Sequence, residues 1–242
     1  MAALTFGVEL EAAYFYATKP GKAGIISSRH EELAPVIDMS LDAIQRRNPE
    51  FPSERFRVDE YMLLELERYV AEVVQDFVNA LPETSRGEVI PATDDPNLNQ
   101  YRQWRVGHDN TITLDFERSY VYTTLRWAPL EVQSPAMYAT EGAFKEVEAV
   151  TDMLRTSFRT TVNPSCGLHV HIGWGPKLFP LEMLKKMAAI VWAGDFLFQQ
   201  MHPVSRRHNR YCQGPRTDSL LEKGHKAAKY NPPSKGVPRS VA

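Results

Sequence analysis

The hydrophobic positions of this chain follow two different periods, and each period predicts a different kind of element. Apolar and polar residues alternate strictly from Phe6 to Glu11 and again from Gly167 to Trp174. Alternation is the period of a strand that has one face in the core, so both stretches are predicted strands. Two more strands are expected, one within residues 104–117 and one ending at 130–133, directly before Ser134-Pro135.

Apolar residues spaced by three and four positions predict amphipathic helices over residues 59–81 and 140–158. Asp59 is placed to cap the first of them. The mostly apolar stretch 181–201 is expected to form a buried helix. The segments between these elements are irregular, because they are rich in Pro, Gly and charge and have no apolar period; they are 19–58, which has room for one short helix, and 82–100.

Strands that are separated by helices and by long loops of varied length favour an α+β fold, with a largely antiparallel sheet flanked by helices. The apolar pattern stops near Gly214. We therefore expect a main domain over residues 1–213 and a poorly ordered basic tail over 214–242.

The composition is that of an ordinary globular protein, with 43% hydrophobic and 24% charged residues in 242. A formal net charge of -2 provides no general attraction to nucleic acid or to a membrane surface. No apolar run approaches the ~20 residues of a membrane helix, and the N-terminus lacks the pattern of a secretory signal. Two cysteines fit a reducing compartment, so a cytoplasmic protein is expected, with its oligomeric state left open.

The polar faces of the two alternating strands carry the first candidate chemistry. Glu9 and Glu11 are two residues apart on a strand and therefore project to the same face. Such a pair suits a hard cation such as Mg²⁺ or Mn²⁺, although a solvated polar face has the same pattern. His169 and His171 also share a face, between two glycines that leave room for a ligand. They suit a metal or a phosphate, or are two half-buried surface histidines.

Three other positions extend this set. Asp109 lies where a loop enters a strand, a place that suits either a functional carboxylate or a turn. Glu131 lies near the end of a predicted strand and offers a third carboxylate. Clustered arginines at 206, 207 and 210 suit phosphate, or form a solvated basic turn. Together, acids that hold metals and arginines that neutralise phosphates are what phosphoryl transfer requires, yet no P-loop or dinucleotide-binding fingerprint is present.

The order of these motifs resembles that of the amidoligase family, which is related to glutamate–cysteine ligase and glutamine synthetase. The resemblance covers roughly residues 5–213. The matching motifs, in order, are Gly7-x-Glu9-x-Glu11, Trp104-x-Val106-x-x-Asp109-x-Thr111-Ile112, Glu131-x-x-Ser134-Pro135, Cys166-Gly167-x-His169-Val170-His171-x-Gly173 and Arg206-x-x-Asn209-x-Tyr211.

The resemblance implies a glutamine synthetase-like catalytic domain that uses ATP and Mg²⁺ or Mn²⁺. In this chemistry a small-molecule or peptide carboxylate becomes an acyl phosphate, and an amine then displaces the phosphate to give an amide. By position, the resemblance assigns metal ligation to Glu9, Glu11, Glu131 and His169, catalytic contacts to Asp109, His171 and Arg206, and nucleotide contacts to Arg206, Asn209 and Arg210.

One departure from the family pattern concerns the C-terminal region. Relatives continue to a further strand with a Glu-Phe-Arg type of motif, which this sequence lacks. The expectation is a domain shortened at its C-terminus, with weak or absent turnover. Two alternatives to an active ligase follow: an inactive nucleotide-binding relative, and a metal-dependent hydrolase that uses His169 and His171 together with Glu131.

Overall fold

The computed structural model of the chain divides into two compact units, Met1–Phe179 and Pro180–Ala242. It describes residues 4–23, 33–57, 59–92, 99–114, 125–207 and 214–218. The predicted tail lies mostly outside these ranges, and the predicted boundary after residue 213 borders a segment that is also outside them. Both therefore stay predictions.

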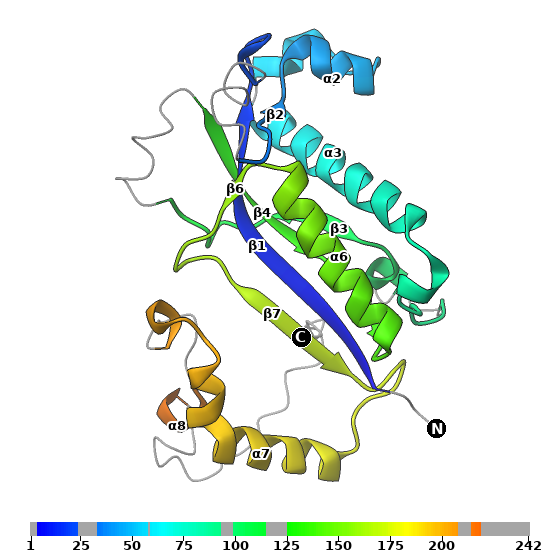
Figure 1. Ribbon diagram of the computed structural model, residues 1–242, viewed down its shortest axis with the longest axis vertical. Helices are drawn as coiled ribbons and strands as arrows, with labels where there is room; N and C mark the ends of the chain where they lie inside the picture. The colour runs from blue at the N-terminus through cyan, green and yellow to red at the C-terminus, as the bar shows by residue number, and fades with distance from the viewer. Residues whose placement is uncertain are drawn as a thin grey trace, which may run out of the picture. The chain divides into compact units, whose positions relative to one another are not determined.

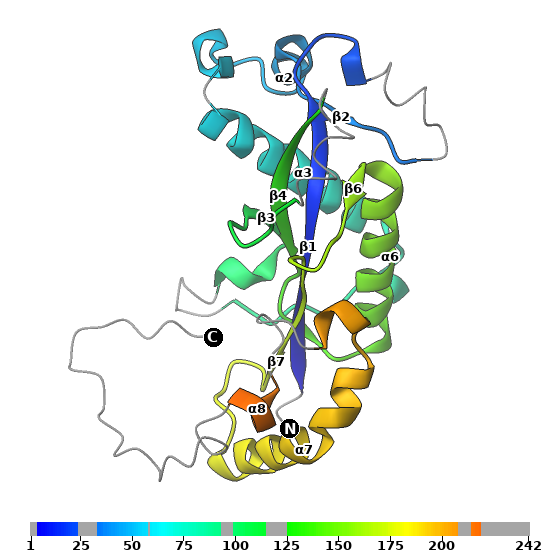
Figure 2. The ribbon, with the colours of Figure 1, turned by 90° about the vertical axis from the view of Figure 1, so that its left-hand side faces the viewer.

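The first unit is built around one long strand, β1 (Thr5–Ala17), which runs the length of the sheet (Figures 1 and 2). It pairs in antiparallel fashion with four strands and in parallel with one short strand. The antiparallel partners are β4 (Arg126–Gln133), β5 (Met137–Tyr138), β6 (Thr160–Thr161) and β7 (Leu168–Gly173), and the parallel one is β2 (Ile37–Asp38). A further strand, β3 (Arg105–His108), pairs antiparallel with β4. The predicted α+β class and the largely antiparallel sheet are confirmed.

Two helices, α3 (Asp59–Ala80) and α6 (Glu141–Ser157), lie side by side across one face of this sheet (Figure 1). The buried positions of α3 recur every four residues and pack with Leu130 and Val132 of β4 in one core. Thr140 caps α6 by accepting a hydrogen bond from the backbone N–H of Ala143 (3.3 Å). Both helices were predicted, and both are confirmed within one or two residues of the expected limits.

The other described helices are the long α7 and several short ones. They are α2 (Leu41–Arg47), η1 (Ser53–Arg57), η2 (Glu83–Ser85) and η3 (Gln100–Arg102) in the first unit, and α7 (Leu181–Gln200), η4 (Val204–Arg206) and α8 (Pro215–Asp218) in the second. None of the described helices is both long and apolar enough to cross a membrane.

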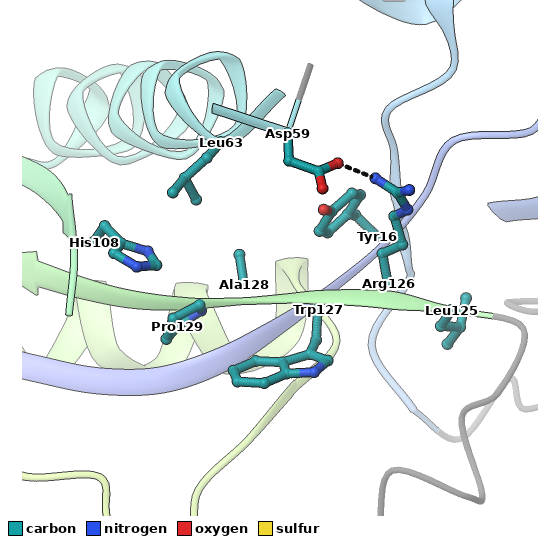
Figure 3. A pocket seen from close by; sticks show the side chains of 9 residues that line it. All are labelled: Tyr16, Asp59, Leu63, His108, Leu125, Arg126, Trp127, Ala128 and Pro129. Carbon is teal, nitrogen blue, oxygen red and sulfur yellow. Dashed lines mark hydrogen bonds and ion pairs between the residues drawn. The ribbon is translucent and has the colours of Figure 1, made fainter. Parts of the chain in front are cut away.

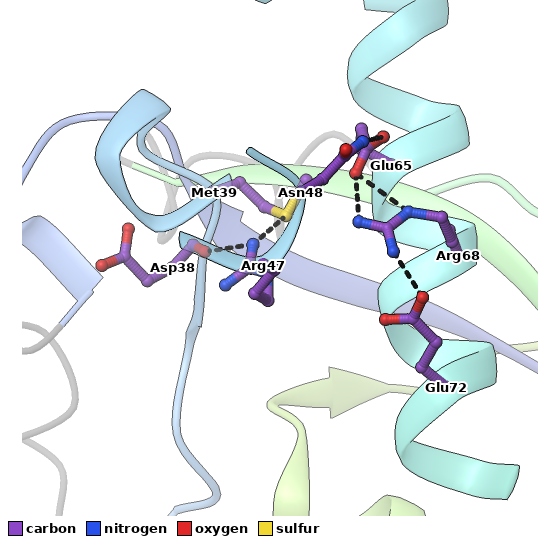
Figure 4. A network of polar contacts seen from close by, with 7 residues as sticks. All are labelled: Asp38, Met39, Arg47, Asn48, Glu65, Arg68 and Glu72. Carbon is purple, nitrogen blue, oxygen red and sulfur yellow. Dashed lines mark hydrogen bonds and ion pairs between the residues drawn. The ribbon is translucent and has the colours of Figure 1, made fainter. Parts of the chain in front are cut away.

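A polar network fixes α2 against α3 (Figure 4). The guanidinium of Arg47 donates to the carbonyl oxygen of Asp38 (3.0 Å) and lies over the ring of Tyr69, 4.3 Å from its centroid. Asn48 donates to Glu65 (2.8 Å), which also pairs with Arg68 on α3. These contacts attach the irregular segment before α3 to the helix that covers the core.

A buried carboxylate ties α6 to the strand region. Glu146 accepts a hydrogen bond from the indole N–H of Trp104 (2.7 Å) and another from the backbone N–H of Gly87 (2.7 Å). Trp104 directly precedes β3 and is itself buried. The contact therefore fixes where β3 begins relative to α6.

Two predicted elements differ from the structure. The strand expected over 104–117 ends at His108, because Asp109 turns the chain: its carboxylate accepts a hydrogen bond from the N–H of Thr111 (2.8 Å). Residues 115–117 of that prediction lie outside the described ranges.

The helix expected at 181–201 forms as α7, but the prediction that it is buried is wrong. Its apolar residues are largely exposed, and Asp195 is its one buried residue. The prediction rested on the hydrophobicity of the segment alone. Among the described elements of the second unit, the short α8 packs against this helix.

The Glu146 contacts give a test of the fold. Substitution Glu146→Ala should lower the free energy of unfolding by about 3 kcal/mol, since the buried indole N–H of Trp104 and the partly buried N–H of Gly87 lose their acceptor. Glu148→Ala, at an exposed position of the same helix, should change it by less than about 0.5 kcal/mol. Urea denaturation measures both values, and equal effects of the two substitutions would contradict this role for Glu146.

Candidate active site

The pairing of β1 with its two neighbours brings the candidate residues onto one face of the sheet. Glu9 stands opposite His169 on β7 and opposite Gln133 on β4. Glu11 stands opposite Glu131 on β4. Residues directly opposite in an antiparallel pair point to the same side. This side, which we call the open face, is the one away from α3 and α6, because Val8 between the two acids is in the core.

The histidines of β7 contact the acids of β1 directly. Nδ1 of His169 lies 2.9 Å from Oε2 of Glu9, and its Nε2 lies 3.3 Å from Oε1 of Glu11. Nε2 of His171 lies 3.1 Å from the other oxygen of Glu9. His169 therefore bridges the two carboxylates, and Glu9 is shared between the two rings.

Glycine at position 167 allows a close approach to Glu11 and His169. Its N–H donates to Oε2 of Glu11 (2.5 Å), and its carbonyl oxygen accepts from the N–H of Glu11 (3.1 Å). A Cβ atom there would lie 2.7 Å from Nε2 of His169 and 3.1 Å from Oε2 of Glu11. The space that the sequence suggested beside the histidines is thus filled by the Glu11 carboxylate, whose side chain is only 3% exposed.

The three carboxylates do not share one electrostatic environment. Burial raises the pKa of Glu9, but hydrogen bonds from His171 and His169 outweigh it, so this pKa lies below its usual value. Burial raises the pKa of Glu131 as well; the hydrogen bond from Gln133 (3.0 Å) opposes the rise, and the charge of Glu9 adds to it. The net pKa of Glu131 is above its usual value, opposite in direction to that of Glu9.

The donor set fits a hard divalent cation. Three carboxylates offer oxygen ligands and His169 adds a nitrogen, which together suit Mg²⁺ or Mn²⁺ better than a softer metal. Within the described ranges, no three His, Cys, Asp or Glu side chains already stand as a metal-binding group. Instead, the imidazoles and carboxylates point at one another, with nitrogen-to-oxygen distances of 2.9–3.3 Å.

The structure places Asp109 near the acids but does not test the position of the arginine motif relative to them. Asp109 forms the turn after β3, and its charge adds to the rise in the pKa of Glu131, so it lies at the edge of the acid cluster. Arg206 ends η4 in the second unit, and Asn209 and Arg210 lie outside the described residues. Whether these three side chains reach the acids stays a prediction.

Several residues with a role here could not be identified from the sequence. Gln133 holds Glu131, and the Gly167 N–H holds Glu11. The hydroxyl of buried Ser134 accepts from the N–H of Val8 (2.8 Å) and donates to the carbonyl oxygen of Pro135 (2.9 Å). The Ser-Pro motif therefore anchors β1 rather than contributing chemistry.

A separate hollow of about 430 Å³ lies on the other side of β4. Figure 3 shows Tyr16, Asp59 and Leu63 on that side and Trp127 on the opposite one. Its ion pair, Arg126 with Asp59 (2.7 Å), is largely exposed, and none of the predicted site residues lines it. The acids of the open face are thus not part of this hollow.

A pair of glycine substitutions tests the close approach at the site. Gly167→Ala should lower the free energy of unfolding by about 1–3 kcal/mol, because the added methyl group overlaps His169 and Glu11. Gly107→Ala is the matched control, since a Cβ there meets nothing within 4 Å and should cost less than about 0.5 kcal/mol. Chemical denaturation measures both values, and the imidazole NMR signals report on the site locally. Equal effects of the two substitutions would contradict the close packing of Gly167 against His169 and Glu11.

Comparison with known proteins identifies the family of this chain. A family model described as "Putative amidoligase enzyme" matches residues 2–239. A search of curated proteins and a search of solved structures each gave no match. The family match spans nearly the whole chain and includes every motif that carries the acids and histidines described above. The chain belongs to the amidoligase family.

Proposed function

We propose that this protein is an ATP-dependent carboxylate–amine ligase that requires Mg²⁺ or Mn²⁺. The observation that carries the proposal is the cluster on the open face, where three carboxylates from β1 and β4 meet two imidazoles from β7. Family membership supports a ligase. A sheet of mostly antiparallel strands with one acid-lined open face is also what a relationship to glutamine synthetase would require.

In the proposed reaction, a carboxylate oxygen of the substrate attacks the γ-phosphorus of ATP and the bond to ADP breaks. The nitrogen of an amine then attacks the acyl carbon, and phosphate leaves with the proton that the nitrogen loses. The products are an amide, ADP and phosphate. No side chain of the protein has to form a covalent bond, so positioning and charge neutralisation provide the catalysis.

Each residue of the cluster then has a role. Glu9, Glu11, Glu131 and His169 would hold the divalent cation, which neutralises phosphate charge when bound. Gly167 and Gln133 hold the Glu11 and Glu131 carboxylates in place. His171, whose side chain is 55% exposed beside Glu9, is in position to contact the phosphoryl oxygens. Arg206, Asn209 and Arg210 are proposed nucleotide contacts and Asp109 a contact to the amine.

A metal-binding experiment tests the cluster. Glu11→Gln keeps the shape of the side chain but removes a charge, and should weaken Mn²⁺ binding roughly tenfold or more. Glu72→Gln removes a surface charge on α3 and should leave the affinity unchanged. Electron paramagnetic resonance of free Mn²⁺ measures both. Stoichiometric zinc in the purified protein, together with no nucleotide binding, would instead favour a metal-dependent hydrolase built on His169 and His171.

The reaction itself is tested by ADP release from ATP in the presence of pooled amino acids and polyamines. Release should require Mg²⁺ or Mn²⁺, should rise when the pool is added, and should be lost in Glu11→Gln but not in Glu72→Gln. Binding of Mg-ATP without any pool-dependent ADP release would show that the chain is an inactive nucleotide-binding relative.

A further inference from the structure

Arg105 occupies a place on the open face that neither its motif nor the predicted site includes. It is the first residue of β3 and stands opposite Gln133 of β4, which in turn stands opposite Glu9 of β1. His169 of β7 completes the same cross-strand row. Val106, the next residue along β3, packs against the core, so Arg105 points to the face that carries the acids.

The charge of Arg105 is distinctive in these surroundings. It is the one lysine or arginine that β1, β3, β4 and β7 present on the open face. Its side chain is exposed and donates one hydrogen bond, to Oε1 of the neutral Gln100 (3.1 Å). Within the described part of the chain it has no acidic partner. A guanidinium has five N–H donors, so among the described residues most of its donors are left for a ligand.

The surface of β3 beside Glu131 is open in the described part of the chain. Gly107 follows Arg105 on the same face and stands opposite Glu131. A Cβ atom at Gly107 would meet nothing within 4 Å, in contrast to the crowded Gly167 at the other end of the same row. The Trp104 contact to Glu146 fixes the start of β3 beneath this surface. Among the described residues, Gly107 therefore leaves room beside Glu131 for a ligand that extends from the acid cluster over β3, with Gln133 next to it in the same region.

We propose that Arg105 binds a carboxylate of the substrate other than the one that is activated, so that the enzyme selects substrates with two carboxylates. Resting on the proposed ligase function, this assignment names the substrate class. The Cα atoms of Arg105 and Glu9 are separated by two strand spacings, on the order of 10 Å. The phosphates of the nucleotide would bind at the acid cluster, where the cation neutralises their charge. The guanidinium of Arg105 lies farther away and can bind a second carboxylate in bidentate geometry.

Binding measurements with defined probes test the assignment. Succinate, glutarate and adipate are each compared with the monocarboxylate of equal length, namely butyrate, valerate and hexanoate, with and without Mg²⁺ and the non-hydrolysable ATP analogue AMPPNP. The wild type should bind at least one diacid roughly tenfold more tightly than its monoacid. Arg105→Met should abolish that preference, and Arg105→Lys should restore part of it because the positive charge returns.

The control is Arg102→Met, three residues earlier and also exposed, whose guanidinium donates to the carbonyl oxygen of Ile90 (3.3 Å). It should keep the diacid preference, and all variants should keep the melting temperature of the wild type. No preference in the wild type, or an unchanged one in Arg105→Met, overturns the assignment. A loss of AMPPNP affinity in Arg105→Met equal to the loss of diacid affinity would show a phosphate contact instead. Failure of the wild type to bind AMPPNP counts against the ligase proposal alone, since the diacid comparison is also made without nucleotide.

Discussion

The site depends on the register with which β1 pairs on both of its edges. That register puts Glu9 between His169 and Gln133, and Glu11 beside Glu131. A slip by one residue would turn the acids toward the core and Val8 toward solvent, which the apolar face of β1 strongly opposes. Ser134 adds a local restraint, because its buried hydroxyl is bonded to the N–H of Val8. Packing on one face of the strand thus determines the chemistry on the other.

Three carboxylates so close together need compensation, and the chain provides it from a different strand. His169 and His171 supply the contacts to Glu9, and the backbone N–H of Gly167 supplies one to Glu11. The histidine contacts lower the pKa of Glu9, whereas burial and the neighbouring charge raise that of Glu131. Two neighbouring acids whose pKa values shift in opposite directions indicate a functional site, because two acids on a solvated strand surface would both keep pKa values near the usual one.

The sequence predicted which segments form strands and helices better than it predicted which segments pair or pack with one another. Alternation of apolar and polar residues identified β1 and β7, and apolar residues spaced by three and four identified α3 and α6. Each of these patterns depends only on which positions within one segment face the core. Register is a relation between segments far apart in the chain, so the roles of Gln133 and Arg105 could not be seen beforehand. Asp109 shows a local limit: its side chain accepts a hydrogen bond from the backbone N–H of Thr111 and ends a strand that the apolar pattern predicts to continue. The exposed α7 shows that an apolar pattern predicts a need for burial, not the partner that provides it.

The motifs that identify the family divide into chemical and supporting residues, and the division has a physical basis. Glu9, Glu11 and the two histidines present charge and lone pairs on the open face. Trp104 does not reach that face: its indole N–H is bonded to buried Glu146, and its role is to hold β3 where the strand starts. Because β3 carries Arg105 and Gly107 at the edge of the acid cluster, a buried contact on α6 controls the outer half of the site. A substitution at Glu146 should therefore disturb the region proposed to bind the substrate's second carboxylate more than the acid cluster on β1, which Ser134 and β7 hold independently.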